Sequence, residues 1–419
     1  MRSRSRLLRA TLSDVTPLRE SRQYRVLYVG ELVGFLGSQL TVVAVPFQVY
    51  ELTRSSLAVG LVGLVQLGPL LACSLAGGAL VDAVDRRRLL LASQALRGAL
   101  SAGLVANALL PHPALWPLYL LTGAAAGLQA VDGPARNAAI PALVRRELLP
   151  AAAALHQIVM QVGQVAGPAA AGLVIGHVSL AAAYAIDVAC YAAATLLVLA
   201  LRPLPPGEGG RRAGLASVRE GLRFLRGRRA LQATFYIDLN AMVFGMPRAL
   251  FPALGTGVFG GGAATVGLLY AAPGAGALLG AATAGWVGRV RRQGRAVLVS
   301  VAVWGAAITA FGLVRSLPPA LCLLGVAGAA DVVSAVFRST ILQLAVPDGL
   351  RGRLSAIHIA VVTGGPRLGD VEAGVVARLT SPRFSVVSGG LACLAGVALL
   401  AWRLPQLDRT VAEPAAGLS

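Results

Sequence analysis

Long apolar runs constrain this chain more than any other feature of its sequence. Twelve of them follow one another along the 419 residues, separated by short polar segments. A helix needs about 20 apolar residues to cross a bilayer, and lipid offers no partner for exposed backbone groups. The sequence therefore predicts an all-α integral membrane protein with twelve transmembrane helices. The predicted spans cover approximately residues 26–50, 57–81, 88–110, 114–135, 150–175, 179–201, 230–254, 263–287, 294–315, 317–340, 353–378 and 383–403.

The composition excludes an ordinary soluble enzyme. Hydrophobic residues make up 56% of the chain and charged residues only 13%, whereas soluble proteins carry about 25% charged residues. The first apolar run begins beyond residue 25 and is too long for the core of a signal peptide, so we expect no cleaved leader. The four cysteines lie in apolar stretches with no C-x-x-C pair, which favours small buried residues over metal or redox chemistry.

The distribution of the basic residues predicts how the chain is oriented in the membrane. All 37 of them are arginines, against 18 acidic residues, for a net charge of +19. Thirty lie in every second connecting segment, and only Arg54, Arg315, Arg378 and Arg383 lie in the others. Because cytoplasmic loops are enriched in basic residues, both termini are predicted to be cytoplasmic. The charge is then explained by orientation, and no nucleic-acid partner is expected.

The two halves of the chain resemble each other at a nearly constant offset. Residues 78–87 align with 280–289 and residues 123–136 with 325–338, both at an offset of 202. Gln39 to Pro46 aligns with Asn240 to Pro247 at an offset of 201. Three matched segments in the same order indicate two pseudo-symmetric six-helix bundles, as in internally repeated transporters.

This repeat divides the chain into predicted parts. They are a basic tail over 1–25, a first bundle over 26–201, a cytoplasmic linker over 202–229, a second bundle over 230–403 and a tail over 404–419. Within the linker, apolar residues recur at helical spacing from Leu215 to Leu225, with arginines on the other side. That pattern predicts an amphipathic helix on the membrane surface.

A motif between the second and third spans carries a family resemblance. Gly78 is followed four residues later by Asp82 and then by the basic cluster Arg86-Arg87-Arg88. The stretch resembles the cytoplasmic loop signature of the major facilitator superfamily, although it departs from that signature at Ala83 and Asp85. The resemblance implies a conformational latch between the two halves. Its candidate residues are Gly78, Asp82, Arg86, Arg87, Asp132 and Arg136.

The fifth span carries a second motif, Gly163-x-x-x-Gly167-Pro168-x-x-x-Gly172. It resembles the G-x-x-x-G-P-x-x-G-G motif of the drug/proton antiporter branch, with Ala171 in place of one glycine. Small residues let helices approach closely, and an internal proline bends a helix. In the family the motif accompanies export, so the resemblance implies export and not uptake.

Two further cytoplasmic stretches fit the same family, from Arg136 to Leu148 after span four and from Arg338 to Arg353 after span ten. Together with the stretch from Gln39 to Pro46 in span one, they make the chain most similar to the enterobactin-exporter-like group of twelve-helix facilitators. The resemblance covers nearly the whole chain. It implies the major facilitator fold, in which spans one, four, seven and ten line a central cavity. Span four, over Leu120 to Gly127, lacks the buried arginine that many proton-driven exporters carry there.

Charged and polar residues inside spans mark candidate sites, because each needs a partner, water or a function. The cavity or gating candidates are Gln39, Asn240, Arg248, Asp331, Arg367, Asp370 and Glu372. In span eleven, Arg367 and Asp370 stand three residues apart and are predicted to pair. Gly364-Gly365-Pro366 directly before them predicts a broken helix. Arg97 and Asp187 lie on spans three and six, where we expect packing roles.

A carboxyl can carry protons near neutral pH only where burial disfavours its charged form. Asp370 beside Arg367 and Asp331 near Arg338 are then poorer carriers, because paired carboxylates stay ionised. Asp238 has no basic residue within one helical turn, and Glu31 is similarly unpaired along its own span. Asp238 is therefore the first proton-coupling candidate and Glu31 the second.

Other chemistry finds little support in the sequence. The four histidines, His112, His156, His177 and His358, show no metal-ligand spacing and are expected to be ordinary interfacial residues. A P-loop is excluded because the chain has no lysine. We expect no metal, no cofactor and no enzymatic activity.

The sequence is thus identified as a monomeric transporter of the bacterial cytoplasmic membrane. It is predicted to export a small amphiphilic compound, a siderophore or a drug-like metabolite, in exchange for protons. Two alternatives stay open. One is an uptake symporter or facilitator for a polar nutrient, and the other is a membrane receptor or scaffold with the same fold.

Overall fold

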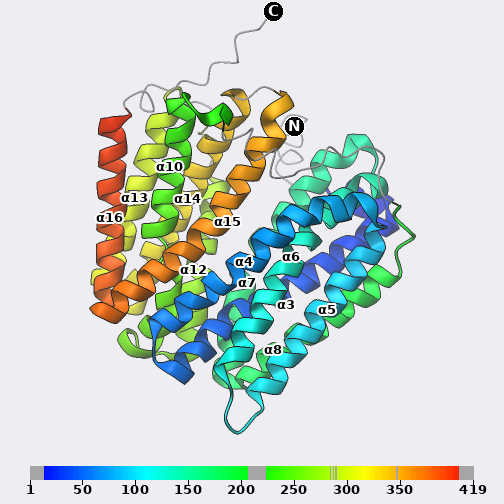
Figure 1. Cartoon of the computed structure of the whole chain (residues 1–419), viewed down its shortest axis with the longest axis horizontal. Helices are drawn as coiled ribbons and strands as arrows, with labels where there is room; N and C mark the ends of the chain where they lie inside the picture. The colour runs from blue at the N-terminus through cyan, green and yellow to red at the C-terminus, as the bar shows by residue number, and fades with distance from the viewer. Residues whose placement is uncertain are drawn as a thin grey trace, which may run out of the picture.

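The protein is all-helical over the residues that the structure, a computed structural model, describes (Figure 1). These are residues 14–205, 223–283, 285, 287, 290–345 and 348–404. A few side chains within those ranges are also outside the description, namely 75–79, 82, 229–230, 345, 348–353, 355–357 and 359–360. The amphipathic helix predicted for the linker falls largely on residues 206–222, outside the described ranges.

Each predicted span contains a long helix, and the helices form two bundles (Figure 1). After the short α2 (Thr16–Glu20), the first bundle contains α3 (Arg22–Thr53), α4 (Ser56–Ala83), α5 (Arg86–Ala108), α6 (Leu115–Leu143), α7 (Leu149–His177) and α8 (Leu180–Leu199). The second contains α10 (Arg229–Phe244), α12 (Gly262–Ala282), α13 (Gln293–Leu313), α14 (Leu317–Ala345), α15 (Asp348–Leu379) and α16 (Pro382–Arg403). Among the described residues, nine helices are long and apolar enough to cross a membrane.

Short capped connections let the chain reverse direction between helices. Ser55, Ser179 and Ser381 begin α4, α8 and α16 by accepting a backbone N–H three residues on, which satisfies a donor that the helix itself cannot. Asp85 does the same for α5 and accepts the N–H of Arg88 at 3.0 Å. The aspartate that departs from the family signature is therefore a helix cap.

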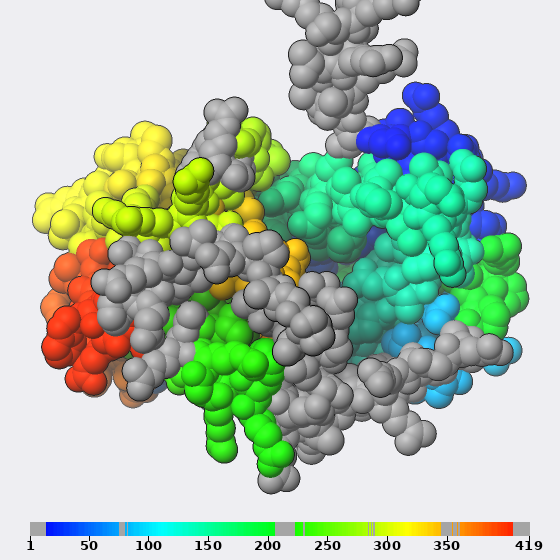
Figure 2. Space-filling model, turned by 90° about the horizontal axis from the view of Figure 1, so that it is seen from above, coloured from blue at the N-terminus to red at the C-terminus, as the bar shows by residue number. Residues whose placement is uncertain are grey.

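The two bundles meet at the end of the molecule opposite both termini and diverge toward the termini (Figure 1). α7 and α12 touch there, where a side chain at Gly172 would lie 2.9 Å from the carbonyl oxygen of Ala263 and from the Cα of Gly267. An apolar core at this end includes Val45 and Ile175 from the first bundle and Val266 from the second. Seen from the termini, the bundles lie side by side (Figure 2).

The prediction of a broken helix in span eleven was wrong. α15 is continuous from Asp348 to Leu379 with Pro366 inside it. Its glycines allow close packing, since a side chain at Gly365 would lie 2.8 Å from the Cβ of Met242 in α10.

The break occurs in span seven instead. α10 ends at Phe244, before Pro247, and proline cannot continue the hydrogen bonding of a helix. The chain goes on through η2 (Arg248–Leu250), α11 (Phe251–Ala253) and the π-helical η3 (Leu254–Val258).

Candidate functional site

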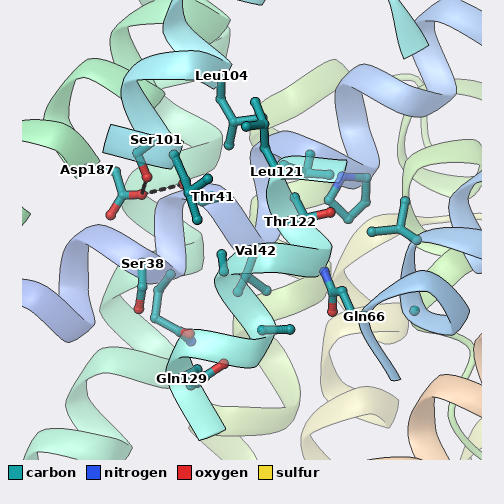
Figure 3. Close-up of a pocket in the computed structure, with 18 of the residues that line it drawn as sticks. Ser38, Thr41, Val42, Gln66, Ser101, Leu104, Leu121, Thr122, Gln129 and Asp187 are labelled. Carbon is teal, nitrogen blue, oxygen red and sulfur yellow. Dashed lines mark hydrogen bonds between the residues drawn. The ribbon is translucent and has the colours of Figure 1, made fainter. Parts of the chain in front are cut away.

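A cavity of about 340 Å³ lies between the two bundles (Figure 3). Helices α3, α4, α5, α6 and α8 line it from the first bundle, and η2, α12 and α15 line it from the second. Its size falls near the lower end of the roughly 300–1,000 Å³ typical of small-molecule sites. Polar groups converge on it, among them Ser38, Gln39, Gln66 and Gln129.

The wall from the first bundle is built around a buried carboxylate. Asp187 Oδ2 accepts hydrogen bonds from the hydroxyls of Thr41 at 2.7 Å and Ser101 at 2.6 Å (Figure 3). Arg97 lies over the ring of Tyr191, with its guanidinium carbon 4.8 Å from the ring centre. Arg97 and Asp187 both line the cavity. Their roles are therefore not limited to the helix packing that the sequence predicts for them.

The wall from the second bundle is built on the break after α10. The backbone N–H of Ala249 donates a hydrogen bond to Asp370 Oδ1 at 3.0 Å. The hydroxyl of Tyr270 donates one to the carbonyl of Arg248 at 3.0 Å. The indole of Trp304 donates to the carbonyl of Gly245 at 2.7 Å. Side chains from three other helices thus satisfy the backbone that the break exposes.

The predicted pair of Arg367 and Asp370 is not formed. Arg367 Nη1 donates to the carbonyl of Thr363 at 2.5 Å, whereas Asp370 binds Ala249 in η2. A long helical side chain leans toward the preceding turn, and this direction takes Arg367 away from the carboxylate. Both residues nevertheless line the cavity, as do Gln39 and Arg248.

Three guanidinium groups and two carboxylates face the cavity. The arginines are Arg97, Arg248 and Arg367, and the acids are Asp187 and Asp370. The Nε atoms of Arg97 and Arg367 are buried and have no hydrogen-bond partner within the described part of the chain. The cavity lining therefore has three basic side chains against two acidic ones.

Three cavity or gating candidates lie away from the cavity lining. Asn240 Nδ2 donates to the carbonyl of Cys393 at 2.9 Å and packs α10 against α16. Asp331 lies in the second bundle, 3.9 Å from Arg338 Nη2, which agrees with the predicted proximity of these two residues. Glu372 is half-buried on α15.

The first bundle contains a buried polar cluster, which we call the N-cluster: Glu31, Ser93, Asp132, Arg136 and His156. Arg136 lies 2.8 Å from Asp132 Oδ2 and 3.8 Å from Glu31 Oε1. His156 Nδ1 lies 2.7 Å from the same oxygen of Glu31, and Ser93 donates to Asp132 Oδ1 at 2.7 Å. Glu31 of α3 is thus paired with side chains of two other helices, Arg136 of α6 and His156 of α7.

The second bundle contains a similar group, the C-cluster: Asp238, Asp331, Arg338 and His358. Arg338 Nη1 forms an ion pair with Asp238 Oδ1, and His358 Nδ1 lies 4.0 Å from Asp238 Oδ2. Asp238 is almost completely buried.

The clusters correct two expectations. Neither Asp238 nor Glu31 has a basic residue nearby on its own helix, which made them the predicted proton carriers, yet both are paired across helices. His156 and His358 were expected to be ordinary interfacial residues, yet each faces a buried carboxylate. Periodicity along one helix cannot report a partner on another.

The candidate latch residues make their described contacts inside the first bundle. Arg87 donates to the carbonyls of Val198 at 3.4 Å and Leu199 at 2.7 Å, at the end of α8. The backbone N–H of Arg86 donates to Leu204, and Asp132 and Arg136 belong to the N-cluster. Gly78 and Asp82 lie among the side chains outside the description, so the latch stays a prediction.

The motif of the fifth span packs α7 against α3 of its own bundle and against α12 of the other bundle. Side chains added at Gly163 and Gly167 would collide with Phe35 and Gln39 of α3, while Gly172 and the carbonyl of Pro168 face α12. The motif thus provides close packing; its association with export is not tested by this geometry.

Two helical bundles around a central polar cavity define a multi-pass membrane transporter of the major facilitator fold. Residues 12–418 match the transmembrane secretion effector family of the major facilitator superfamily, and the chain belongs to that family. The family and the relatives below are transporters and not enzymes.

Curated relatives cover almost the whole chain. It is 31% identical over 399 residues to the enterobactin exporter EntS of Shigella boydii serotype 18, with 95% of each chain covered. It is 30% identical over the same length to the enterobactin exporter EntS of Escherichia coli O1:K1, again with 95% of each covered.

Solved structures show the same fold at low identity. The nucleoside transporter NupG superposes with a TM-score of 0.75 at 13% identity, covering 93% of this chain and 100% of that one. A bacterial homologue of the iron transporter ferroportin in an inward-facing state superposes with a TM-score of 0.68 at 16% identity, covering 93% and 99%. At these identities the likeness concerns the fold alone.

Proposed function

We propose that this protein exports a siderophore-like compound across the bacterial cytoplasmic membrane by alternating access, in exchange for protons. The observation that carries the proposal is the cavity between the bundles, whose lining has three arginines against two aspartates. The enterobactin exporters that the chain resembles along 95% of its length support a siderophore as the cargo class.

The lining favours an oxygen-rich, partly anionic substrate. Guanidinium groups form charge-assisted, often bidentate hydrogen bonds with oxyanions. Arg97, Arg248 and Arg367 approach from three different elements, α5, η2 and α15. Apolar residues such as Val42, Leu104 and Leu121 complete the wall (Figure 3) and suit the flat apolar parts of an amphiphilic molecule.

The packing of the bundles supports a state open toward the termini. The close contact of α7 with α12 at Gly172 lies at the end opposite the termini. With both termini cytoplasmic, as the arginine distribution predicts, this state would load substrate from the cytoplasm. Rocking of the bundles about the cavity would then release it on the other side.

Export can be tested in enterobactin-producing cells that lack their own exporter. Expression of this chain should move enterobactin from the cells into the medium, measured in both fractions by mass spectrometry. Unchanged secretion at good membrane abundance would contradict export of this class. Increased cellular uptake of added enterobactin would favour the symporter alternative.

Matched variants locate the activity in the cavity. Arg248→Gln removes a cavity guanidinium and should reduce secretion at least tenfold at equal abundance. Arg315→Gln removes an exposed arginine from a loop and should leave secretion unchanged. Equal secretion by the two variants would show that Arg248 does not contribute to transport.

A further inference from the structure

The N-cluster and the C-cluster are related by the internal repeat. Arg136 and Arg338 are equivalent at an offset of 202, and His156 and His358 are equivalent at the same offset. Their acidic partners, Glu31 and Asp238, lie on α3 and α10, the first helices of the two bundles. In each bundle the fourth helix therefore supplies the arginine and the fifth supplies the histidine.

The two clusters also share a charge balance. In the N-cluster, the carboxylates of Glu31 and Asp132 share the single guanidinium of Arg136. In the C-cluster, Asp238 and Asp331 share Arg338. With a neutral imidazole each group carries one net negative charge, and with a protonated imidazole it is neutral.

Each imidazole is more exposed than the buried carboxylate that it faces. The side chain of His156 is 29% exposed against 8% for Glu31, and that of His358 is 32% exposed against 1% for Asp238. A proton can therefore reach each imidazole more easily than the carboxylate that the imidazole faces.

We infer that the N-cluster and the C-cluster are a duplicated pair of proton-binding sites, one in each bundle, in which the histidine takes up the proton. The arginine holds the buried carboxylate in its ionised form, and the carboxylate in turn stabilises an imidazolium. Histidine is the side chain that ordinarily changes charge near neutral pH. Binding a proton removes the net charge of a buried cluster and so favours its burial.

The groups around each imidazole are consistent with this role. His156 faces Glu31 of α3 and Arg136 of α6. Asp132 pairs with Arg136, and Tyr24 and Tyr28 lie on the turns of α3 that precede Glu31. Arg97 of α5 acts on Asp132 from the cavity side.

His358 faces Asp238 from α10 and Arg338 from α14, and the ring of Phe235 meets its edge at 6.2 Å. Asp331 interacts with Arg338, which pairs with the carboxylate facing His358, and Arg248 interacts electrostatically with Asp331 from the cavity side. Each bundle therefore places one cavity arginine beside its cluster. This arrangement gives a route by which substrate in the cavity and a proton in the cluster could influence each other.

Proton binding can be measured without knowing the substrate. The chain has only four histidines, so protein labelled with carbon-13 and nitrogen-15 at histidine gives four imidazole signals in lipid nanodiscs. His112 and His177 are exposed and serve as internal controls. Each signal is assigned by a histidine-to-glutamine variant and followed between pH 5 and 8.5.

We expect the imidazoles of His156 and His358 to titrate in this range and their titration to depend on their clusters. Glu31→Gln should lower the protonated fraction of His156 at pH 6.5 by at least threefold, and Asp238→Asn should do the same for His358. His112 and His177 should not respond. A His156 or His358 that stays neutral at pH 5, or that ignores its carboxylate, would overturn the inference.

The link to transport rests on the proposed function and is tested separately. In vesicles, His156→Gln with His358→Gln should abolish the pH dependence of enterobactin transport, while His112→Gln with His177→Gln keeps it. Wild-type pH dependence in the first double variant would overturn the inference and leave export intact. Absence of transport by the wild-type chain would instead overturn the proposed function, while the imidazole titration would still decide the proton sites.

Discussion

The first helices of the two bundles, α3 and α10, differ in structure at a proline that occupies equivalent positions in the two halves. Pro46 and Pro247 are equivalent in the internal repeat. α3 continues through Pro46, whereas α10 ends at Phe244, before Pro247. The residue two positions before the proline is Ala44, inside α3, in the first bundle and Gly245, directly after α10, in the second. A proline alone therefore does not decide where a membrane helix ends.

The surroundings of each proline explain the difference. Ala44 is completely buried, in a core that holds α3 in place. In the other bundle, Gly245 accepts a hydrogen bond from Trp304, and Asp370 accepts the N–H of Ala249 beyond the break. A break is tolerated in a membrane protein where neighbouring groups satisfy the freed backbone. The asymmetry places polar backbone groups of a broken helix at the cavity wall of the second bundle.

The largest effect should come from the arginines that pair with the acids of α3 and α10. Arg136→Leu and Arg338→Leu each deprive two carboxylates of their guanidinium. Removing one partner of a buried ion pair destabilises a protein by about 3–5 kcal/mol. Both variants should unfold at much lower temperature in detergent, as measured by intrinsic fluorescence.

Arg145→Leu is the control for both, because it removes an exposed partner of Glu20. Exposed ion pairs contribute about 0–1 kcal/mol, so its unfolding should change little. A stable Arg338→Leu variant beside an unstable Arg136→Leu variant would show that the two clusters are not equivalent.

A smaller effect is expected where α10 breaks. A side chain at Gly245 would lie 2.6 Å from Trp304 Nε1 and 2.8 Å from the carbonyl of Ala241, and overpacking destabilises by about 1–3 kcal/mol. Gly245→Ala should therefore lower the unfolding temperature. Gly68→Ala, with nothing within 4 Å, should not lower it, and equal losses in the two variants would argue against a specific contact at the break.

The smallest effect concerns the hydrogen bond that closes the break. Trp304→Phe removes the donor to Gly245, and such a bond contributes about 0.5–1.5 kcal/mol. Trp402→Phe is its control, because Trp402 is 72% exposed. Denaturant unfolding that leaves both variants indistinguishable from the wild type would mean that the break needs no support from Trp304.

Much of the fold could be predicted because it follows from local patterns. Each apolar run contains a long helix, and the two repeated halves form two bundles (Figure 1). The position of the helix break could not be read locally. Gly364 to Pro366 has the stronger breaking composition, yet packing against α10 keeps α15 continuous, and the break forms at Gly245, where tertiary partners exist.

The site was predicted in part. Gln39, Arg248, Arg367 and Asp370 line the cavity, whereas the partners of the buried acids were missed. Asp238 and Arg338 lie 100 positions apart, and no periodicity within one helix connects them. The histidines were detectable, because His156 and His358 stand at the offset of the repeat, and that signal becomes useful only when the repeat is searched for matching polar residues.

The most direct test of exchange of substrate for protons uses purified protein in vesicles with an acidic lumen. Enterobactin is supplied outside, and its concentration inside is followed with time. Antiport predicts accumulation above the outside concentration, up to about tenfold per pH unit for electroneutral exchange of one proton, and loss of that accumulation when a protonophore collapses the gradient. Equal concentrations on both sides with the gradient intact, or depletion from the acidic lumen, would contradict it.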